Sequence, residues 1–227
     1  MLFGALGDIH GDFESATRII ARHPDVSFWL CVGDLADDAG RYQALGSRVY
    51  WIKGNNENFD AIAARDLPEP LPFLDNGEMV TIDGLRVAGL GGTFAPTWYE
   101  TPAADLPHPL KSTAKATALA DKRRHFVREE VERLKAMTGI DVLLTHEAAR
   151  PYRIGGRGPD AGKTPINDVR PAAAPRLHLF GHHHAYTDQQ RQGVRSIGLD
   201  LVSQSYLLVE APSLEVELVD ARRFAKG

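Results

Sequence analysis

The first third of the chain alternates short apolar runs with segments of helical pattern. The apolar runs lie at 2–6, 27–32 and 49–53, with a helix expected after Asp12 and a shorter helix before the third run. This βαβαβ order predicts an α/β fold with parallel strands. Ligands gather at the carboxyl ends of the strands in such sheets, so that edge is the expected place for a functional site.

Later apolar runs predict further strands. Residues 79–92 are typical of a hairpin with Asp83 and Gly84 as its two-residue turn, and they make the sheet mixed. The tail alternates strands again, which supports a second sheet packed on the first. The strands expected after the hairpin lie at 140–144, 177–180, 194–197, 206–210 and 214–219.

A long insertion at about 93–139 separates the hairpin from the next strand. It begins with a loop rich in proline and aromatic residues at 93–109. In this loop Trp98 and Tyr99 could stack on an aromatic ligand, although anchoring the loop is the expected role. A long charged helix over 111–137 follows, and its charged residues are expected to form a solvated face with i,i+4 ion pairs.

A second unusual segment follows the strand at 140–144. Residues 148–175 carry arginine, glycine and proline with little periodicity, which predicts mostly a loop with one short helix near Asn167. We expect about 148–170 to be a mobile rim of the active site. There Arg150 and Arg157 could meet a phosphate or carboxylate group of a substrate, and a merely solvated loop is the alternative.

The composition fits one globular, soluble domain over residues 1–227. With 43% hydrophobic residues in 227, the chain can bury a sizeable core. The net charge of -4 gives no overall attraction to nucleic acid or to an anionic membrane, so an anionic substrate must be held locally. No apolar run approaches the roughly 20 residues needed to cross a bilayer. No charged leader region precedes Asp8, so we expect the protein in the cytoplasm.

Five short segments each end a predicted strand with residues that can bind metals. Together they supply two aspartates, one asparagine and three or four histidines. This mixed set of oxygen and nitrogen ligands has the size needed to hold two divalent metals. Each motif alone is also typical of a turn or a helix cap, but five in order are not. The segments are Gly7-Asp8-Ile9-His10, Gly33-Asp34, Gly54-Asn55-Asn56-Glu57, Thr145-His146 and Gly181-His182-His183-His184.

These five segments resemble the motifs of the calcineurin-like metallophosphoesterases, which are Asp-x-His, Gly-Asp, Gly-Asn-His-Glu/Asp, a lone His and Gly-His-x-His. The resemblance covers residues 2 to about 210. It implies a four-layered α/β/β/α sandwich with two mixed β-sheets. It also implies a binuclear hydrolase of phosphate esters, with a small molecule or a nucleotide as substrate. The sequence leaves the oligomeric state open.

The resemblance also implies the metal ligands, with Asp34 bridging two cations. Mn²⁺ is the expected metal and an Fe/Zn-type pair the alternative, because imidazole and carboxylate ligands suit several such ions. Two cations sharing a solvent molecule lower its pKa enough to give hydroxide near neutrality, and they clamp phosphoryl oxygens. Glu57 is expected to orient loop groups rather than bind metal. The implied ligands are Asp8, His10, Asp34 and His184 for one metal, and Asp34, Asn55, His146 and His182 for the other.

Asn56 stands where most of the family has a histidine that contacts phosphate and can protonate the leaving group. An amide donates no titrating proton, and general acid catalysis is worth about 10² to 10⁴ in rate. We therefore expect a reacting centre of Asp34, Asn55, Asn56 and His146 that binds the phosphate of a phosphodiester or activated ester. In the alternatives, His183 replaces the missing acid, or the chain is a metal-binding scaffold with little or no catalysis.

Overall fold

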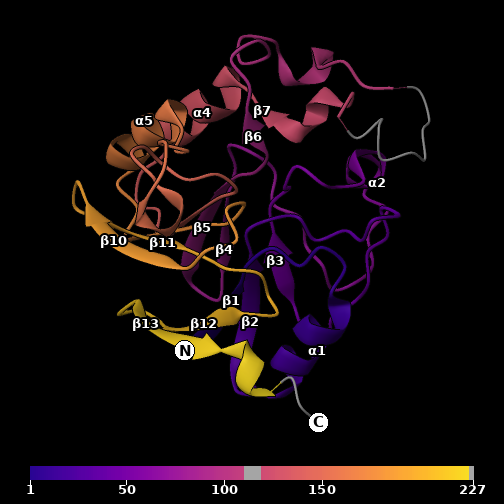
Figure 1. The fold of residues 1–227 in the computed structure, drawn as a ribbon, viewed down its shortest axis with the longest axis vertical. Helices are drawn as coiled ribbons and strands as arrows, with labels where there is room; N and C mark the ends of the chain where they lie inside the picture. The colour runs from indigo at the N-terminus through magenta and orange to yellow at the C-terminus, as the bar shows by residue number, and fades with distance from the viewer. Residues whose placement is uncertain (110–118, 225–227) are drawn as a thin grey trace.

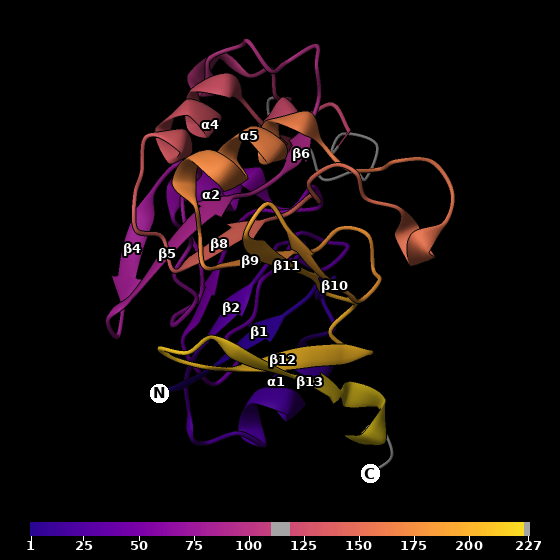
Figure 2. The same ribbon diagram turned by 90° about the vertical axis from the view of Figure 1, so that its left-hand side faces the viewer.

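The computed structural model describes residues 1–109 and 119–224, and in it two β-sheets face each other (Figures 1 and 2). In the first sheet, β1 (Leu2–Leu6) pairs parallel with β2 (Val26–Cys31) and antiparallel with β12 (Ser205–Glu210), which makes the sheet mixed. The order of this sheet is β13 (Glu215–Asp220), β12 (Ser205–Glu210), β1 (Leu2–Leu6), β2 (Val26–Cys31) and β3 (Val49–Trp51).

The second sheet has four parallel strands at its centre and an antiparallel strand at each edge. A separate pair of short parallel strands, β6 (Thr93–Phe94) and β7 (His125–Phe126), lies beside it. The order of the second sheet is β10 (Thr187–Arg191), β11 (Val194–Gly198), β9 (Leu177–Phe180), β8 (Val142–Thr145), β5 (Leu85–Leu90) and β4 (Met79–Ile82).

Helices cover the outer faces of the two sheets, which gives the four layers that the sequence predicted. Figure 2 shows α1 (Phe13–Ala21) below the first sheet and the pair α4 (Arg128–Lys135) and α5 (Thr164–Ala173) above the second. A further helix, α2 (Phe59–Ala64), follows β3. Short 3₁₀ turns are η1 (Ala103–Asp105), η2 (Lys122–Arg124), η3 (Ile154–Gly156) and η4 (Ala221–Phe224).

Apolar side chains fill the three spaces between these layers. Phe3, Phe28 and Leu144 belong to the central cluster between the sheets. A second cluster joins the first sheet to α1, and a third joins the second sheet to α4 and α5. Burial of these side chains on both sides of each sheet explains why the central strands are almost wholly apolar.

The first helix starts where the sequence places its cap. The Asp12 side chain accepts a hydrogen bond from the backbone N–H of Ser15 at 3.1 Å, and Asn58 caps α2 in the same way through Ala61. Such caps satisfy donors that the first turn of a helix leaves unpaired. Both caps directly follow ligand segments, so they also fix where the ligand loops end.

One predicted helix is absent, and another forms only over its last part, as α4 (Arg128–Lys135). The segment between β2 and β3 contains no helix and is held instead by Asp37, whose carboxylate accepts from the backbone N–H groups of Ala39 and Arg41. The long helix predicted over 111–137 is absent from 119–127, where a 3₁₀ turn and β7 replace it. Residues 111–118 of that prediction lie outside the described residues.

Other differences concern the assignment of strands to sheets. The predicted hairpin forms with Asp83 and Gly84 at positive φ, as its turn requires, but it belongs to the second sheet. The tail strands divide between both sheets. The sequence missed β10, and the short helix near Asn167 is the ten-residue α5.

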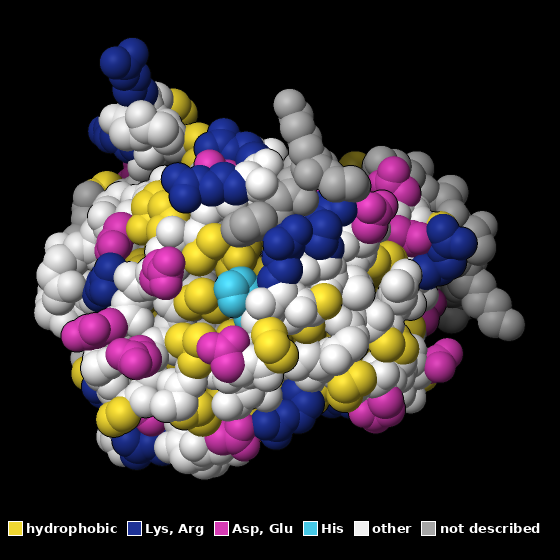
Figure 3. All heavy atoms as spheres, turned by 90° about the horizontal axis from the view of Figure 1, so that it is seen from below, with side chains coloured by type: hydrophobic (Ala, Val, Ile, Leu, Met, Phe, Trp, Pro, Cys, Tyr) yellow, Lys and Arg dark blue, Asp and Glu magenta, His cyan; other side chains and the backbone are white. Residues whose placement is uncertain are grey.

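No helix within the described ranges is long and apolar enough to cross a membrane. The face of the molecule seen from below carries Lys and Arg side chains interspersed with Asp and Glu side chains (Figure 3). This mixture fits the small net charge of the chain and offers no single-sign surface there to attract a polyanion.

Candidate metal centre

The five ligand segments meet at one edge of the sandwich. Each follows the carboxyl end of a strand, and these ends lie together because the two sheets face each other. Ligand atoms gather in two groups, and within each group they lie within 4.8 Å of one another. The first group is Asp8, His10 and His184, and the second is Asp34, His146 and His182.

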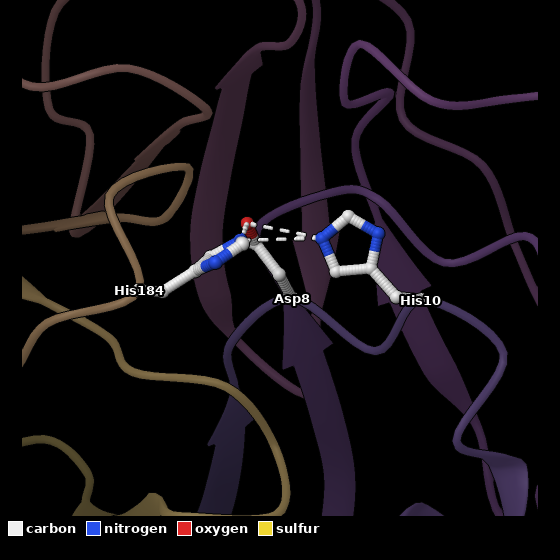
Figure 4. Close-up of side chains that lie close together, drawn as sticks. All are labelled: Asp8, His10 and His184. Carbon is white, nitrogen blue, oxygen red and sulfur yellow. Dashed lines mark hydrogen bonds and ion pairs between the residues drawn. The ribbon is translucent and has the colours of Figure 1, made fainter.

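In the first group, two histidine rings converge on one carboxylate (Figure 4). The Nε2 atom of His184 lies 3.0 Å from Oδ2 of Asp8, and the Nε2 atoms of His10 and His184 are 3.2 Å apart. Asp8 is buried, whereas the His10 and His184 side chains are 34% and 42% exposed. The open side of this group is therefore accessible to solvent or to a substrate.

The second group is deeper. His146 is fully buried, and its Nδ1 lies 2.8 Å from the carbonyl of Val32, to which it can donate. This bond leaves Nε2 facing the site, where Oδ1 of Asn55 lies 3.0 Å away. The His182 ring is 4.9 Å from the His146 ring. Asn55 thus joins the second group, as the sequence resemblance implied.

Asp34 links the two groups. Its Oδ2 atom is 3.5 Å from Nε2 of His10 in the first group and 3.7 Å from Nε2 of His146 in the second. Burial acts to raise the pKa of Asp34, but His146, the N–H groups of Asn56 and His10 outweigh it and lower the pKa. Asp34 therefore stays ionised at neutral pH, in the place that a bridging ligand occupies.

The donor set fits divalent metals. Burial acts to lower the pKa of His146, yet the carboxylates of Asp34 and Asp8 and the bond to Val32 raise it. The surroundings of the buried ring therefore favour a positive charge there. The ring nitrogens of His10 and His184 also face each other at 3.2 Å beside the shared carboxylate of Asp8. A cation between these groups would satisfy all of them. The residues present thus suit two ions such as Mn²⁺, Fe²⁺ or Zn²⁺.

Glycines allow the ligand loops to approach one another. A Cβ atom on Gly54 would stand 2.0 Å from Oδ1 of Asp34, and one on Gly181 would stand 2.2 Å from Oδ1 of Asp8. A Cβ on Gly33 would meet Nδ1 of His146 at 2.8 Å. The glycine that comes before each of these ligand residues is therefore a steric requirement of the site.

Glu57 holds two ligand loops together, as expected. Its buried carboxylate accepts hydrogen bonds from the backbone N–H groups of Leu35, Ala36 and Gly54 and from the hydroxyl of Tyr42, at 3.0 to 3.2 Å. Burial, aided by the charge of Asp34, raises the pKa of Glu57 to about 7. It fixes the loop of Asp34 against the loop of Asn55 and belongs to neither ligand group.

Asn56 and His183 have distinct surroundings. The exposed Asn56 donates from its backbone N–H to Oδ1 of Asp34 at 2.8 Å and from its amide to Oδ2 at 2.9 Å. His183 belongs to neither ligand group and packs between Tyr152 and His182, with ring centroids 4.6 and 5.1 Å from its own. Burial lowers the pKa of His183 to about 4. It is therefore neutral at pH 7 and poorly suited to replace the missing acid.

The rim arginines are not brought to the ligand groups. Arg150 pairs with Asp160 at 2.9 Å, and the exposed Arg157 follows η3 with no ligand-group contact among the described residues. Figure 2 shows the segment around η3 extending away from the sheets. Their predicted contact with substrate stays a prediction.

Three charged residues near the site were missed or undervalued in the sequence. Glu147, next to His146, is buried and lies 3.3 Å from Nζ of Lys163 and 3.8 Å from Nε2 of His182. Burial raises its pKa. Lys53 directly precedes the ligand segment at 54–57, and its ammonium holds the backbone on both sides of Arg124. Position next to a ligand motif was the available signal for Glu147 and Lys53, and Arg124 offered none.

The aromatic loop residues have the anchoring role. Tyr99 is buried and packs edge-on against Phe94 and Phe126, at 5.2 and 6.4 Å. Trp98 lies under the ammonium of Lys122, 5.9 Å from the ring centre. These contacts fix the insertion loop to the pair β6 and β7.

Comparisons with known proteins agree with this geometry. Residues 1–186 match the profile of the calcineurin-like phosphoesterase family. An uncharacterized protein of Haemophilus influenzae is 25% identical, over 78% of this chain and 81% of that protein. The solved structure of the Thermus thermophilus protein TT1561 is 16% identical with a TM-score of 0.65, covering 97% of this chain and 99% of that one. An archaeal phosphodiesterase has 11% identity, a TM-score of 0.51 and the same coverage. These structural likenesses concern the fold.

Proposed function

The chain belongs to the calcineurin-like phosphoesterase family, a family of metal-dependent hydrolases of phosphate esters, and from that premise we propose that it hydrolyses a phosphodiester or an activated phosphate ester at a two-metal centre. The proposed ions are two Mn²⁺, with Fe or Zn as alternatives. The proposed substrate is a small phosphate ester or a nucleotide. Residence in the cytoplasm and the single-domain organisation stay predictions.

One observation carries this proposal. The Oδ2 atom of Asp34 lies between His10 and His146, at 3.5 and 3.7 Å, and so joins the two groups of ligand atoms. When bound, two divalent cations held this way supply Lewis acidity that activates water near neutral pH and neutralises phosphoryl charge. A scaffold needs no such shared carboxylate, which favours the enzyme over the scaffold alternative.

The chain's own residues have separable roles in this proposal. One ion would be held by Asp8, His10 and His184, and the other by Asn55, His146 and His182, with Asp34 placed to serve both. Asn56 is bonded to Asp34 and projects an amide that can donate to a phosphoryl oxygen but releases no proton. A leaving group that is already a weak base needs no protonation, which is why a diester or activated ester is proposed.

The direct experiment is hydrolysis of bis-p-nitrophenyl phosphate and p-nitrophenyl phosphate by the Mn²⁺-reconstituted protein. Asp34→Ala is the inactive variant, and Glu100→Ala, which removes an exposed carboxylate outside both ligand groups, is the matched control. Turnover that is lost only in Asp34→Ala supports the proposal. No turnover of either ester with two metals bound favours the scaffold alternative.

The role given to Asn56 has its own experiment. Asn56→His restores the proton donor that most of the family has at this position. We expect the rate for esters with poor leaving groups to rise relative to the rate for p-nitrophenyl esters, by up to about 10². An unchanged preference would remove the argument from the missing acid and leave the two-metal proposal intact.

A further inference from the structure

Arg124 lies on a segment that the fold holds tightly against Lys53, the residue before the ligand loop at 54–57. The half-buried ammonium of Lys53 donates to the carbonyls of Arg123 and His125, at 2.8 and 3.1 Å, and so grips the backbone on both sides of Arg124. Residue 125 also pairs with Thr93 in the short sheet of β6 and β7. The position of Arg124 is therefore fixed by contacts far apart in sequence.

The same contacts connect Arg124 to a ligand loop. Lys53 directly precedes Gly54 and Asn55, and its carbonyl accepts from the N–H of Gly92 at 2.7 Å. A Cβ atom on Gly92 would stand 2.5 Å from the carbonyl oxygen of Arg124. The backbone of Arg124 thus packs beside Lys53, and the next residue, Gly54, lies against the Asp34 carboxylate.

The guanidinium of Arg124 has an unused donor. Its Nε atom is buried and has no hydrogen-bond acceptor among the described residues. Burial lowers the pKa of Arg124, and the carboxylates of Asp34 and Asp121 oppose that change. Asp121 is already paired with Arg123, at 2.9 Å from Nε. Asp34, in the metal centre, is the remaining carboxylate that acts on Arg124.

A buried guanidinium donor without an acceptor is costly, and an anion brought to the metal centre would satisfy it. We propose that Arg124 binds a phosphoryl oxygen of the substrate beside the two metals. This proposal rests on the proposed function, because only a two-metal centre at Asp34 would bring the phosphoryl group there. Arginine presents a planar fork of donors that suits phosphate, and its charge persists at every working pH.

This role bears on the missing histidine. A guanidinium cannot act as a general acid, because it does not release its proton near neutral pH. It can stabilise charge that develops on the phosphoryl oxygens during displacement. Arg124 and the amide of Asn56 would then together bind the phosphate, as the histidine does in most of the family. Neither group would protonate the leaving group.

The experiment measures binding of inorganic phosphate to the Mn²⁺-loaded protein by isothermal titration calorimetry, with metal content determined on each sample. Arg124→Gln should weaken phosphate binding about 10- to 100-fold with two metals retained. Arg124→Lys should lie between wild type and Arg124→Gln, because the charge remains and the fork is lost. The matched control is Arg128→Gln, which removes an exposed pair with Glu100 and should bind phosphate as wild type does.

The outcomes separate this proposal from the proposed function. Phosphate binding by wild type that neither Arg124 variant weakens would overturn the role of Arg124 alone. A metal-loaded wild type that binds no phosphate would overturn both. Should Arg124→Gln lose its metals or its fold, Arg124→Lys decides. Normal affinity in that folded variant contradicts the guanidinium contact proposed for Arg124, and weaker affinity supports it.

Discussion

The ligand loops and the rim segment at 148–163 are both rich in glycine, yet the glycines do opposite things. At Gly54 and Gly181, a Cβ atom would collide with the carboxylates of Asp34 and Asp8. At Gly155 and Gly156 of the rim, a Cβ atom would meet nothing within 4 Å. In these ligand loops glycine permits close packing, whereas at Gly155 and Gly156 it only permits a positive φ.

Charged groups differ between the two regions in the same way. Glu57 in the ligand loops is buried and accepts four hydrogen bonds. Arg150 and Asp160 in the rim form an ion pair whose arginine is 52% exposed. Exposed pairs are worth little, and buried acceptors are expensive to lose. Close packing and buried hydrogen bonds therefore fix the metal centre, whereas the arginine of the rim pair stays open to solvent.

Gly54→Ala should have the largest effect, because its methyl group must displace the Asp34 carboxylate. Movement of a catalytic group by about 1 Å can cost about 10² in rate, and here we also expect loss of metal. The rim control Gly156→Ala should keep two metals and normal turnover, with only the local cost of its positive φ. Metal analysis and ester hydrolysis check both. Equal metal content in the two variants would break the comparison.

Glu57→Gln should come next. In the wild-type protein, backbone N–H donors face both carboxylate oxygens of Glu57. In the variant an NH₂ group replaces one of these oxygens and leaves its donors without an acceptor, which costs about 3 kcal/mol of unfolding free energy. Urea unfolding of the metal-free protein measures the loss. The exposed control Glu100→Gln, which loses only a surface pair with Arg128, should keep an unfolding free energy close to that of the wild-type protein. A Glu57→Gln protein as stable as that control would show that the ligand loops do not depend on this carboxylate.

Lowering the pH should reduce the free energy of unfolding through His178, which is hydrogen-bonded to Thr145 and Ser196. Burial, with the charge of Arg170, lowers the pKa of His178 to about 3, whereas the unfolded chain takes up this proton near pH 6.5. Below about pH 6.5 the unfolded state therefore binds more protons, and this contribution to stability is lost as pH falls, at up to about 1.4 kcal/mol per pH unit.

His178→Gln keeps a polar side chain without a titrating ring, so its stability should fall less steeply between pH 6.5 and 5. By contrast, hydrogen bonds from Tyr152 and Gly162 and the pairing with Arg150 lower the pKa of Asp160 to about 2. Its contribution is present above pH 3.8 and fades only in stronger acid. Urea unfolding with chelator present, from pH 7 to 5, makes the comparison. A slope unchanged by His178→Gln would contradict this account.

Arg157→Ala should have the smallest effect. Because the side chain is exposed at the rim, its predicted contact with substrate should raise KM by no more than about fivefold, about 1 kcal/mol, with kcat unchanged. Steady-state kinetics on the preferred ester decides. A larger rise in KM, or a fall in kcat, would make the rim part of the reacting centre and weaken the contrast between the regions.

The sequence predicted what depends on local pattern. Apolar runs bounded by turn residues gave β1 and β9 at their observed bounds, and each ligand motif lies within a few residues of a strand end. It failed where distant contacts decide. Helix-forming residues at 119–127 adopt a 3₁₀ turn and a strand because Lys53 and β6 hold their backbone.

Two further failures have the same origin. The edge strand β10 has the sequence TDQQR, with no apolar alternation to reveal it, and pairing with β11 alone defines it. The sequence placed Arg124 on a solvated helix face, because the proximity of Arg124 to Asp34 arises from chain folding across about 90 positions. The residues that gather in the two candidate ligand groups were predictable, and Arg124, the proposed phosphate-binding group beside them, was not.

The central claim is that Asp34 joins two metals, and electron paramagnetic resonance of the protein loaded with Mn²⁺ tests it most directly. The account predicts two Mn²⁺ per chain with an exchange-coupled spectrum, and loss of that coupling in Asp34→Ala. A single Mn²⁺ per chain, or two that give only uncoupled signals in the wild-type protein, would contradict it.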